Sequence, residues 1–293
     1  MNQRLLPILA TLTGSLLLAS NAGAEDDISF KATELAAGVY MLEGVGGFSG
    51  GNLGLLTGDD GVVLIDDGLE PLAGKMLSAV QELTGAPVDF VINTHVHGDH
   101  AGGNAAVHQH GATIVAHDSI RQRMLASNAD RDALPEITFA NEVTFHLNGH
   151  EARVIHLQHA HTDGDAIIHF TDVNVIHTGD TMFNGLFPFI DLESGGSVEG
   201  FIAAQTRLIG MSDANTRIIP GHGPLANRGD LIRARDMLVD ARDRIQELLE
   251  QGVSADEILE RNPLADYDED WNWDFITTER MTQQLIEALS ARQ

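Results

Sequence analysis

The feature that most constrains this chain is a cluster of imidazole and carboxylate side chains at residues 94–104, Thr-His-Val-His-Gly-Asp-His-Ala-Gly-Gly-Asn. Within it, His95, His97, Asp99 and His100 stand close together. Neutral imidazole and carboxylate are ligands that suit zinc and similar divalent metals. His95 and His97 would point to one side of an extended backbone, but they would diverge by about 200° in a helix. The spacing therefore predicts a loop just past a strand, and the preceding run Val-Asp-Phe-Val-Ile-Asn supplies that strand.

The first residues have the pattern of a secretory signal peptide. Arg4 gives a positive start, a mostly apolar run follows, and Ala22-Gly23-Ala24 resembles a cleavage site. We predict a signal peptide over residues 1–24, cleaved after Ala24, and a periplasmic or secreted protein. A signal anchor is the alternative. Because the apolar run is short for a membrane span, we expect no membrane anchor after cleavage.

Composition narrows the class of function. The chain has no cysteine, so thiol nucleophiles, thiolate ligands and disulfides are excluded. There are 43 acidic against 17 basic residues, a formal net charge of −26, and no basic run, so we expect no nucleic-acid partner. No linker or repeat divides the mature chain. We predict one domain over residues 25–293 that acts on a small-molecule substrate.

Hydrophobic periodicity predicts short strands with helices interspersed in both halves. The expected strands cover residues 38–42, 52–56, 61–65, 88–93, 112–116, 142–147, 152–157, 166–170, 173–177 and 217–219. The expected helices cover residues 71–83, 118–127, 198–209 and 230–251, and one more follows residue 277. This succession is typical of an α/β protein in which helices cover mixed sheets.

Further candidate ligands lie just after expected strands, where loops commonly carry function. His161 stands in Gln-His-Ala-His-Thr-Asp-Gly-Asp, Asp180 in His-Thr-Gly-Asp-Thr, and His222 in Pro-Gly-His-Gly. Each is flanked by Gly or Thr, so the backbone can turn sharply and the side chain can face a cleft.

Together these motifs resemble the metallo-β-lactamase superfamily. The H-x-H-x-D-H string is followed by H-T-x-G-D, T-G-D and P-G-H-G in the family's order and spacing over essentially the whole mature chain. Ile65-Asp66-Asp67-Gly68 also resembles the family's early I-D-x-G element. The resemblance implies an αββα sandwich, two mixed β-sheets flanked by helices, with metals at one edge between the sheets.

The resemblance also implies two metal sites. The ligands of the first would be His95, His97 and His161. The ligands of the second would be Asp99, His100 and His222. Asp180 would bridge the two metals, and Asp66 would orient a ligand. We expect two zinc ions per chain, with iron or manganese as alternatives.

Such a pair of cations predicts hydrolysis. Two divalent cations can lower the pKa of a shared water from about 15.7 to roughly 7, so that metal-bound hydroxide replaces a Ser or Cys nucleophile. Asp99 would bind metal and accept a hydrogen bond from that hydroxide, which makes it the expected catalytic residue. We therefore predict an enzyme, a zinc-dependent, β-lactamase-like hydrolase of cyclic amides or esters, with β-lactams and lactones as the leading substrates.

The other imidazoles are expected not to bind metal. These are His108, His110, His117, His146, His150, His156, His169 and His177. His159 competes with His161, but His161 carries the H-T-x-G-D context. Asp163 and Asp165 are expected to form turns rather than to bind metal.

Departures from the family's β-lactamases leave other functions open. Those with two zinc ions carry Cys where Asp180 stands and Lys three residues later, where this chain has Phe183. An Asp at position 180 instead resembles the glyoxalase II enzymes of the superfamily, which makes a thioester hydrolase one alternative. A mononuclear-iron sulfur dioxygenase and a non-catalytic periplasmic metal-binding protein are the others. The complete second ligand set argues against a single metal.

Two segments are expected to border the substrate. Residues 44–51 are rich in glycine around Phe48, which predicts a mobile flap over the site. Met182 and Phe183 are expected to line an apolar wall, and burial in the core is the alternative.

Overall fold

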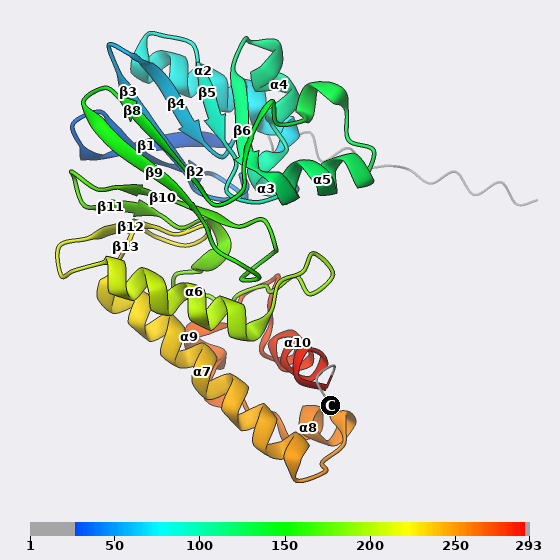
Figure 1. Ribbon diagram of the computed structural model, residues 1–293. Coiled ribbons are helices and arrows are strands. Elements are labelled where there is room, and N and C mark those ends of the chain that lie inside the picture. Colours follow the sequence, from blue (N-terminus) through cyan, green and yellow to red (C-terminus); the bar gives the residue numbers. More distant parts are fainter. Residues whose placement is uncertain (1–26, 291–293) are drawn as a thin grey trace, which may run out of the picture.

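The computed structural model describes residues 27–290, in which two β-sheets pack face to face between helices (Figure 1). The predicted signal peptide lies outside the described residues. The first sheet has seven strands in chain order: β1 Ser29–Ala36, β2 Val39–Val45, β3 Leu53–Gly58, β4 Gly61–Ile65, β5 Phe90–Ile92, β6 Thr113–His117 and β7 Ile137–Phe139. Strands β1 to β4 pair antiparallel and β4 to β7 pair parallel, so the sheet is mixed.

The second sheet follows the first along the chain. Its strands in the described residues are β8 Glu142–Leu147, β9 His150–His156, β10 Ala166–Phe170, β11 Val175–His177, β12 Arg217–Ile219 and β13 Ala226–Asn227. They lie in the order β13-β12-β11-β10-β9-β8. Only β11 and β12 run parallel among these pairs, so this sheet is mixed as well.

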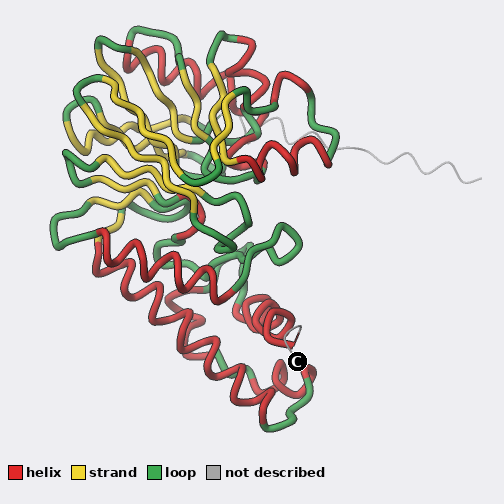
Figure 2. The backbone as a smooth tube through the Cα atoms, in the orientation of Figure 1, coloured by secondary structure: helices red, strands yellow, loops and turns green. Residues whose placement is uncertain are grey.

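Helices cover the outer faces of both sheets (Figure 2). The helices are α2 Ala73–Thr84, α3 Gly98–Ala101, α4 Asn104–Gln109, α5 Asp118–Ala126, α6 Val198–Met211, α7 Arg228–Glu250, α8 Ala255–Arg261, α9 Asp268–Trp271 and α10 Thr278–Ser290. Helices α2 and α4 pack on the first sheet and α6 on the second. Among residues 27–290, no helix is both long enough and apolar enough to cross a membrane.

Alternation along the strands explains the layers. In β4, Val62 and Leu64 pack toward α2, whereas Val63 and Ile65 pack into the core between the sheets. Successive strand side chains point to opposite faces, so a strand buried on both faces reads as a continuous apolar run. The expected αββα sandwich of two mixed sheets is confirmed.

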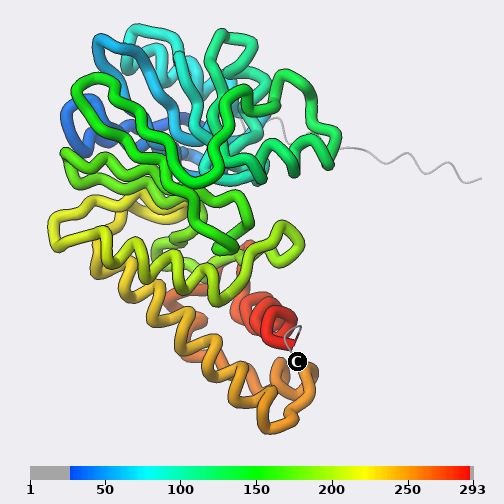
Figure 3. The backbone as a smooth tube through the Cα atoms, viewed as in Figure 1, coloured from blue at the N-terminus to red at the C-terminus, as the bar shows by residue number. Residues whose placement is uncertain are grey.

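The C-terminal helices form a second apolar cluster beside α6. Figure 3 shows the orange and red end of the chain extending away from the sheets and packing along α7. Phe201 of α6, Met237 of α7 and Leu285 of α10 meet in this cluster, together with Phe187 from the loop that follows β11. This packing fixes the segment between α9 and α10 against that loop.

Two local expectations needed correction. Strand β1 was not expected, because half of its eight side chains are exposed and its apolar alternation is weak; it forms by pairing with β2. The residues after β5 were expected to be a loop, but only His95 and His97 are; Asp99 and His100 belong to the short helix α3. The backbone N–H of Ala101 donates a hydrogen bond to the carbonyl of His97, as in a helical turn.

The core between the sheets should dominate the free energy of unfolding. Phe170, which is 1% exposed, packs there. We expect Phe170→Ala to lower the free energy of unfolding by about 3–5 kcal/mol, because it removes buried contacts and leaves a cavity. Ile137→Ala on the edge strand β7, where the side chain is 46% exposed, should change it by less than about 0.5 kcal/mol. Urea titration of both variants measures this, and equal losses would contradict it.

Candidate metal centre

The seven expected ligands gather where strands of both sheets end. The first sheet supplies His95 and His97 after β5, and Asp99 and His100 in α3. The second sheet supplies His161 after β9, Asp180 after β11 and His222 after β12. Segments more than a hundred residues apart in sequence therefore meet at one edge of the sandwich.

Asp180 lies between two groups of imidazoles. Its Oδ2 is 3.7 Å from His95 Nε2 and 3.5 Å from His161 Nε2. Its Oδ1 is 3.0 Å from His100 Nε2 and 3.5 Å from His222 Nε2. One carboxylate thus directs one oxygen to each group, which is the arrangement that a bridging ligand needs.

His97 and Asp99 complete the two groups. His97 Nδ1 lies 2.8 Å from His161 Nε2, and Asp99 Oδ2 lies 3.3 Å from His222 Nε2. The potential ligand atoms form three overlapping sets, and within each set all atoms lie within 4.8 Å of one another. The sets are His95, His97, His161 and Asp180; His95, Asp99 and His100; and His100, Asp180 and His222.

Two imidazoles are held by carboxylates on the side away from Asp180. His97 Nε2 lies 2.8 Å from Asp191 Oδ2, and His100 Nδ1 lies 2.8 Å from Asp66 Oδ2. Asp66 is fully buried, and Thr94 donates to it from both its backbone N–H and its hydroxyl. Since a carboxylate accepts, each ring carries a proton on the anchored nitrogen, and His97 presents its other nitrogen as a lone pair. His100 Nε2 also lies 3.0 Å from Asp180 Oδ1. Burial alone would lower the pKa of His100, but Asp180, Asp99 and Asp66 outweigh it and raise that pKa well above its usual value, so this ring would release its second proton to a metal that binds there.

Two further imidazoles are held by neutral oxygens. His161 Nδ1 donates to the carbonyl of Phe189 at 2.8 Å. His95 Nδ1 lies 3.1 Å from Thr94 Oγ1, whose own proton is directed to Asp66, so the hydroxyl accepts from His95. In both rings the Nε2 atom is left as a lone pair that faces Asp180.

These lone pairs fit a cation. His161 Nε2 and His97 Nδ1 are both acceptors, and they would repel at 2.8 Å unless a positive charge lay between them. His95 Nε2 is buried without a hydrogen-bond partner, and such atoms are rare in native proteins unless they bind a water or an ion. Deprotonated nitrogen is also the form that binds metal. The donor set of imidazole and carboxylate, without thiolate, suits zinc and similar divalent ions.

The surroundings favour the ligating forms of the first group. Burial lowers the pKa of His95 well below its usual value and that of His161 to about 4, so both rings are neutral. Burial by itself would raise the pKa of Asp180, but His100 and His222 outweigh it and hold that pKa well below its usual value. For His222, burial is outweighed by Asp180 and Asp99, which raise its pKa to about 9.

Two glycines make this close approach feasible. A Cβ at Gly221 would overlap Asp180 Oδ1, and a Cβ at Gly51 would overlap the ring of His100. Only glycine fits where backbone passes this close to a ligand. The Gly of Pro-Gly-His-Gly and one Gly of the residue 44–51 loop are therefore required by packing against the centre.

The competing candidates lie elsewhere. His159 is exposed, and its Nδ1 donates to the carbonyl of Gly195. Asp163 pairs with Arg123 at 2.7 Å, and Asp165 accepts hydrogen bonds from Thr162, as turn-forming residues do. Among the described residues, none of the eight imidazoles expected not to bind metal falls in a group of potential ligands.

A cavity of about 870 Å³ opens beside the centre, and Asp99, Asp180 and His222 line it. Phe48 from the glycine-rich loop and Phe183 also line it, and their roles as flap and wall stay predictions. Met182 does not, and that expectation was wrong. Its backbone is extended, so its side chain points opposite to that of Phe183 and is fully buried beneath α6.

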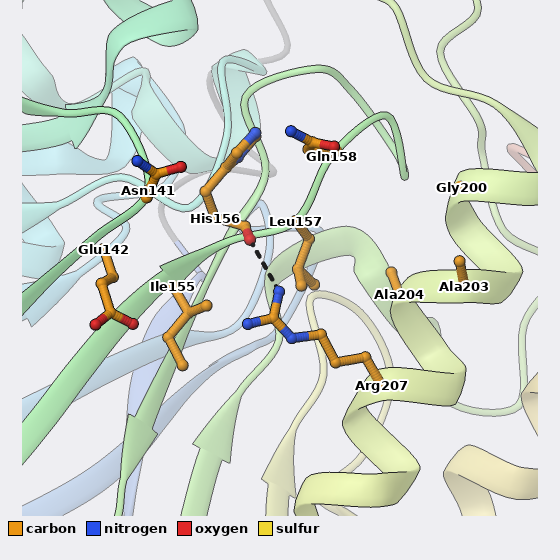
Figure 4. Close-up of a pocket in the computed structure, with 10 residues that line it drawn as sticks. All are labelled: Asn141, Glu142, Ile155, His156, Leu157, Gln158, Gly200, Ala203, Ala204 and Arg207. Atoms are coloured by element: carbon orange, nitrogen blue, oxygen red, sulfur yellow. Dashed lines mark hydrogen bonds between the residues drawn. The ribbon is translucent and has the colours of Figure 1, made fainter.

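A second cavity, of about 450 Å³, lies between the end of β9 and α6 (Figure 4). Arg207 of α6 reaches across it and donates to the carbonyl of His156 at 3.3 Å. None of the potential metal ligands lines this cavity, so it is separate from the centre within the described part of the chain.

Comparison with known proteins decides the family. The sequence profile of the Metallo-beta-lactamase superfamily matches residues 46–236, more than half of the chain. The chain belongs to this superfamily. Its αββα sandwich and the cluster of His and Asp residues at the sheet edge are therefore those of a superfamily member.

Individual similarities are more distant. A hydroxyacylglutathione hydrolase of Nitrosococcus oceani is 27% identical over 165 residues, 54% of this chain and 57% of that protein. Another from Polaromonas sp. is 27% identical over 174 residues, 57% of this chain and 61% of that protein. The chain thus spans somewhat over half the length of these relatives. A metallo-beta-lactamase from Pontibacter korlensis has the same fold, with a TM-score of 0.63, 19% identity and coverage of 72% of this chain and 100% of that one.

Asp191 belongs to the site, but the sequence did not identify it. It follows Asp180 by eleven residues in the chain, and only the fold brings it to His97. Trp273 and Phe275, which also line the cavity, were not identified either. An acidic residue in a loop and aromatic residues near the C-terminus carry no local pattern that marks them as part of a site.

We expect Asp191→Asn to weaken metal binding by about 10–100-fold. The substitution removes a negative charge that orients the His97 ring and makes its other nitrogen a stronger base. Competition with a chromophoric zinc chelator measures the affinity. The matched control is Asp172→Asn, which alters a carboxylate that holds His150, an imidazole outside the centre. An unchanged affinity in Asp191→Asn, or an equal loss in the control, would contradict a positioning role.

Proposed function

We propose that this superfamily member is a binuclear, zinc-dependent, β-lactamase-like hydrolase that opens a cyclic amide or ester. The observation that carries the proposal is the placement of Asp180, whose two oxygens face two separate groups of imidazoles. A site for one cation would not need the second group. Two cations that share a ligand are the arrangement that activates water for attack on a carbonyl carbon.

Each residue of the centre then has a role. One zinc ion would be held by His95, His97 and His161. The other would be held by Asp99, His100 and His222. Asp180 would be shared. Ions held by these residues would supply a water of lowered pKa and positive charge for the carbonyl oxygen.

Asp99 is the proposed catalytic residue. Its side chain is 25% exposed, whereas that of Asp180 is 5% exposed, so Asp99 is the more accessible of the two ligand carboxylates that line the cavity. From there it would take a proton from the attacking water as the water oxygen forms its bond to the carbonyl carbon. It would give that proton to the leaving nitrogen or oxygen as the ring C–N or C–O bond breaks.

A thioester hydrolase of the glyoxalase II type is the second candidate. It is favoured by the names of the relatives and by an Asp at position 180. Glutathione carries two carboxylates, and no Lys or Arg lines the cavity among the described residues. The β-lactams of the first candidate carry one carboxylate and the simple lactones none, so the lactones fit this lining best. We therefore place the thioester hydrolase second. A single-iron dioxygenase would leave the second ligand group unused, whereas a non-catalytic metal-binding protein is distinguished by the absence of turnover.

We expect two zinc ions per purified wild-type chain by elemental analysis, because two ligand groups share Asp180. Asp180→Asn should bind fewer ions and lose more than about 100-fold in kcat/KM. Asp172→Asn should keep the two zinc ions and the wild-type kcat/KM. One iron per chain would instead support the dioxygenase. Tight zinc binding by a wild-type chain that turns over no substrate, so that Asp99→Asn has no activity to lose, would support a non-enzyme.

The substrate is tested on the zinc-loaded protein. We expect hydrolysis of at least one member of a panel of penicillins, cephalosporins, carbapenems and lactones, and loss of that activity on addition of a chelator. S-lactoylglutathione is the comparison for the thioester candidate. Absence of hydrolysis across the cyclic panel, with turnover of the thioester, would replace the first proposal by the second.

We also propose that the protein is exported and acts in the periplasm or outside the cell. The support is the signal-peptide pattern of residues 1–24. In a secreting bacterial host we expect the recovered protein to begin at Glu25, as measured by intact mass. Recovery of the full-length chain in the cytoplasm would contradict export.

A further inference from the structure

We infer that the substrate carries a flat, uncharged aromatic group, and that the segment between α9 and α10 selects it. The inference rests on the proposed function, because it takes the occupant of the cavity beside the centre to be the substrate. It goes beyond that function by assigning a substrate class and the residues that recognise it.

The cavity has aromatic walls. Phe48, Phe183, Phe189, Trp273 and Phe275 line it. The rings of Phe48 and Phe183 lie nearly parallel to His222, at interplanar angles of 12° and 19°. Phe183 contacts Trp273 at a centroid distance of 6.1 Å, and Trp273 contacts Phe275 at 5.5 Å. Aromatic faces arranged in this way favour a flat aromatic ligand through stacked and edge contacts.

The charge of the cavity disfavours an anion. Among the described residues, no Lys or Arg lines it, whereas Glu70, Asp99, Asp180 and Asp274 do. Two divalent cations at the centre would more than offset Asp99 and Asp180, whereas Glu70 and Asp274 have no Lys or Arg beside them in the lining, and Asp274 stands between Trp273 and Phe275 in the chain. A carboxylate on the part of the substrate that reaches Trp273 and Phe275 would meet the charge of Asp274, and the net charge of −26 adds to the repulsion.

Arg280 does not supply the missing cation. Its guanidinium stacks on Phe275 at 4.2 Å from the ring centroid, and its Nη1 donates to the carbonyl of Phe275 at 2.7 Å. It also lies 5.6 Å from the ring of Phe189. Arg280 therefore supports the aromatic wall and does not line the cavity.

The aromatic wall is held in place by the C-terminal helices. Trp273 Nε1 donates to the carbonyl of Phe187 at 2.9 Å, and Thr278 N donates to Asn272 Oδ1 at 2.9 Å. Yet Phe275 remains 46% exposed, although a fully buried neighbour, Ile276, anchors the segment. This segment lies beyond residue 236, where the match to the superfamily profile ends. Selection by it would therefore come from a part of the chain outside that match.

Calorimetric titration of the zinc-loaded protein tests the inference without requiring turnover. The two probes are 2-acetylnaphthalene and 6-acetylnaphthalene-2-sulfonate, which share the ring and the ketone and differ in charge; sulfonate is a weak metal ligand. We expect the neutral probe to bind at least about tenfold more tightly. Equal or tighter binding of the sulfonate would overturn the inference.

Variants test the assigned residues. Phe275→Ala and Trp273→Ala should each weaken binding of the neutral probe by about 5–30-fold, whereas Leu125→Ala, an exposed residue of α5 outside the cavity, should not. Thermal unfolding checks that the variants fold. Because Trp273 bonds to Phe187, Phe275→Ala is decisive if Trp273→Ala unfolds. Unchanged binding in a folded Phe275→Ala would overturn the inference.

A charge reversal completes the design. Asp274→Lys should narrow the preference for the neutral probe, whereas Asp59→Lys, an exposed residue in the turn between β3 and β4, should leave it unchanged. An equal effect of both variants would show that net charge alone sets the preference, against selection by the segment that carries Asp274.

Hydrolysis separates this inference from the proposed function. The substrates are δ-valerolactones that carry either a phenyl or a carboxylate substituent. Turnover of the phenyl compound at a kcat/KM at least about tenfold higher supports both proposals. Equal turnover of the two overturns the inference and leaves hydrolysis established. Selective binding of the neutral probe without turnover of any cyclic amide or ester refutes the hydrolase and supports the cavity's specificity.

Discussion

The carboxylate of Asp180, shared between two groups of imidazoles, is the interaction on which the site depends. Its Oδ2 faces His95 and His161, and its Oδ1 faces His100 and His222. Because these residues come from both sheets, the centre forms only when the two sheets are packed face to face. The core between the sheets thus positions the chemistry at their shared edge.

Anchoring of the imidazoles is the second requirement. An oxygen behind the ring holds the far nitrogen of His97, His100 and His161, and it does so with its proton attached. Each ring therefore already turns its other nitrogen toward the centre before any cation arrives. Burial adds to this by keeping His161 neutral. Preorganised ligands bind metal without losing orientational freedom, since the fold has already restricted it.

Much of the fold could be predicted, because strands buried on both faces give continuous apolar runs such as residues 61–65, and most strand-end ligands follow such runs. Strand β1 could not, since an edge strand with exposed side chains is stabilised by pairing with β2 rather than by its own pattern. The side chain of Met182 was misplaced for a related reason. Which of two neighbouring side chains faces a cavity depends on the backbone direction, and the spacing alone does not fix it.

The sequence by itself determined the kind of ligands, their order along the chain and the family, because a dense H-x-H-x-D-H string and its partners are local patterns. Only the tertiary structure decided which nitrogen of each ring faces Asp180, that Asp191 holds His97, and that Trp273 and Phe275 border the cavity. These contacts join residues far apart in sequence, as with His97 and Asp191 at a separation of 94. Periodicity and turn chemistry act over a few neighbouring residues, whereas contacts of this length are set by how the layers pack.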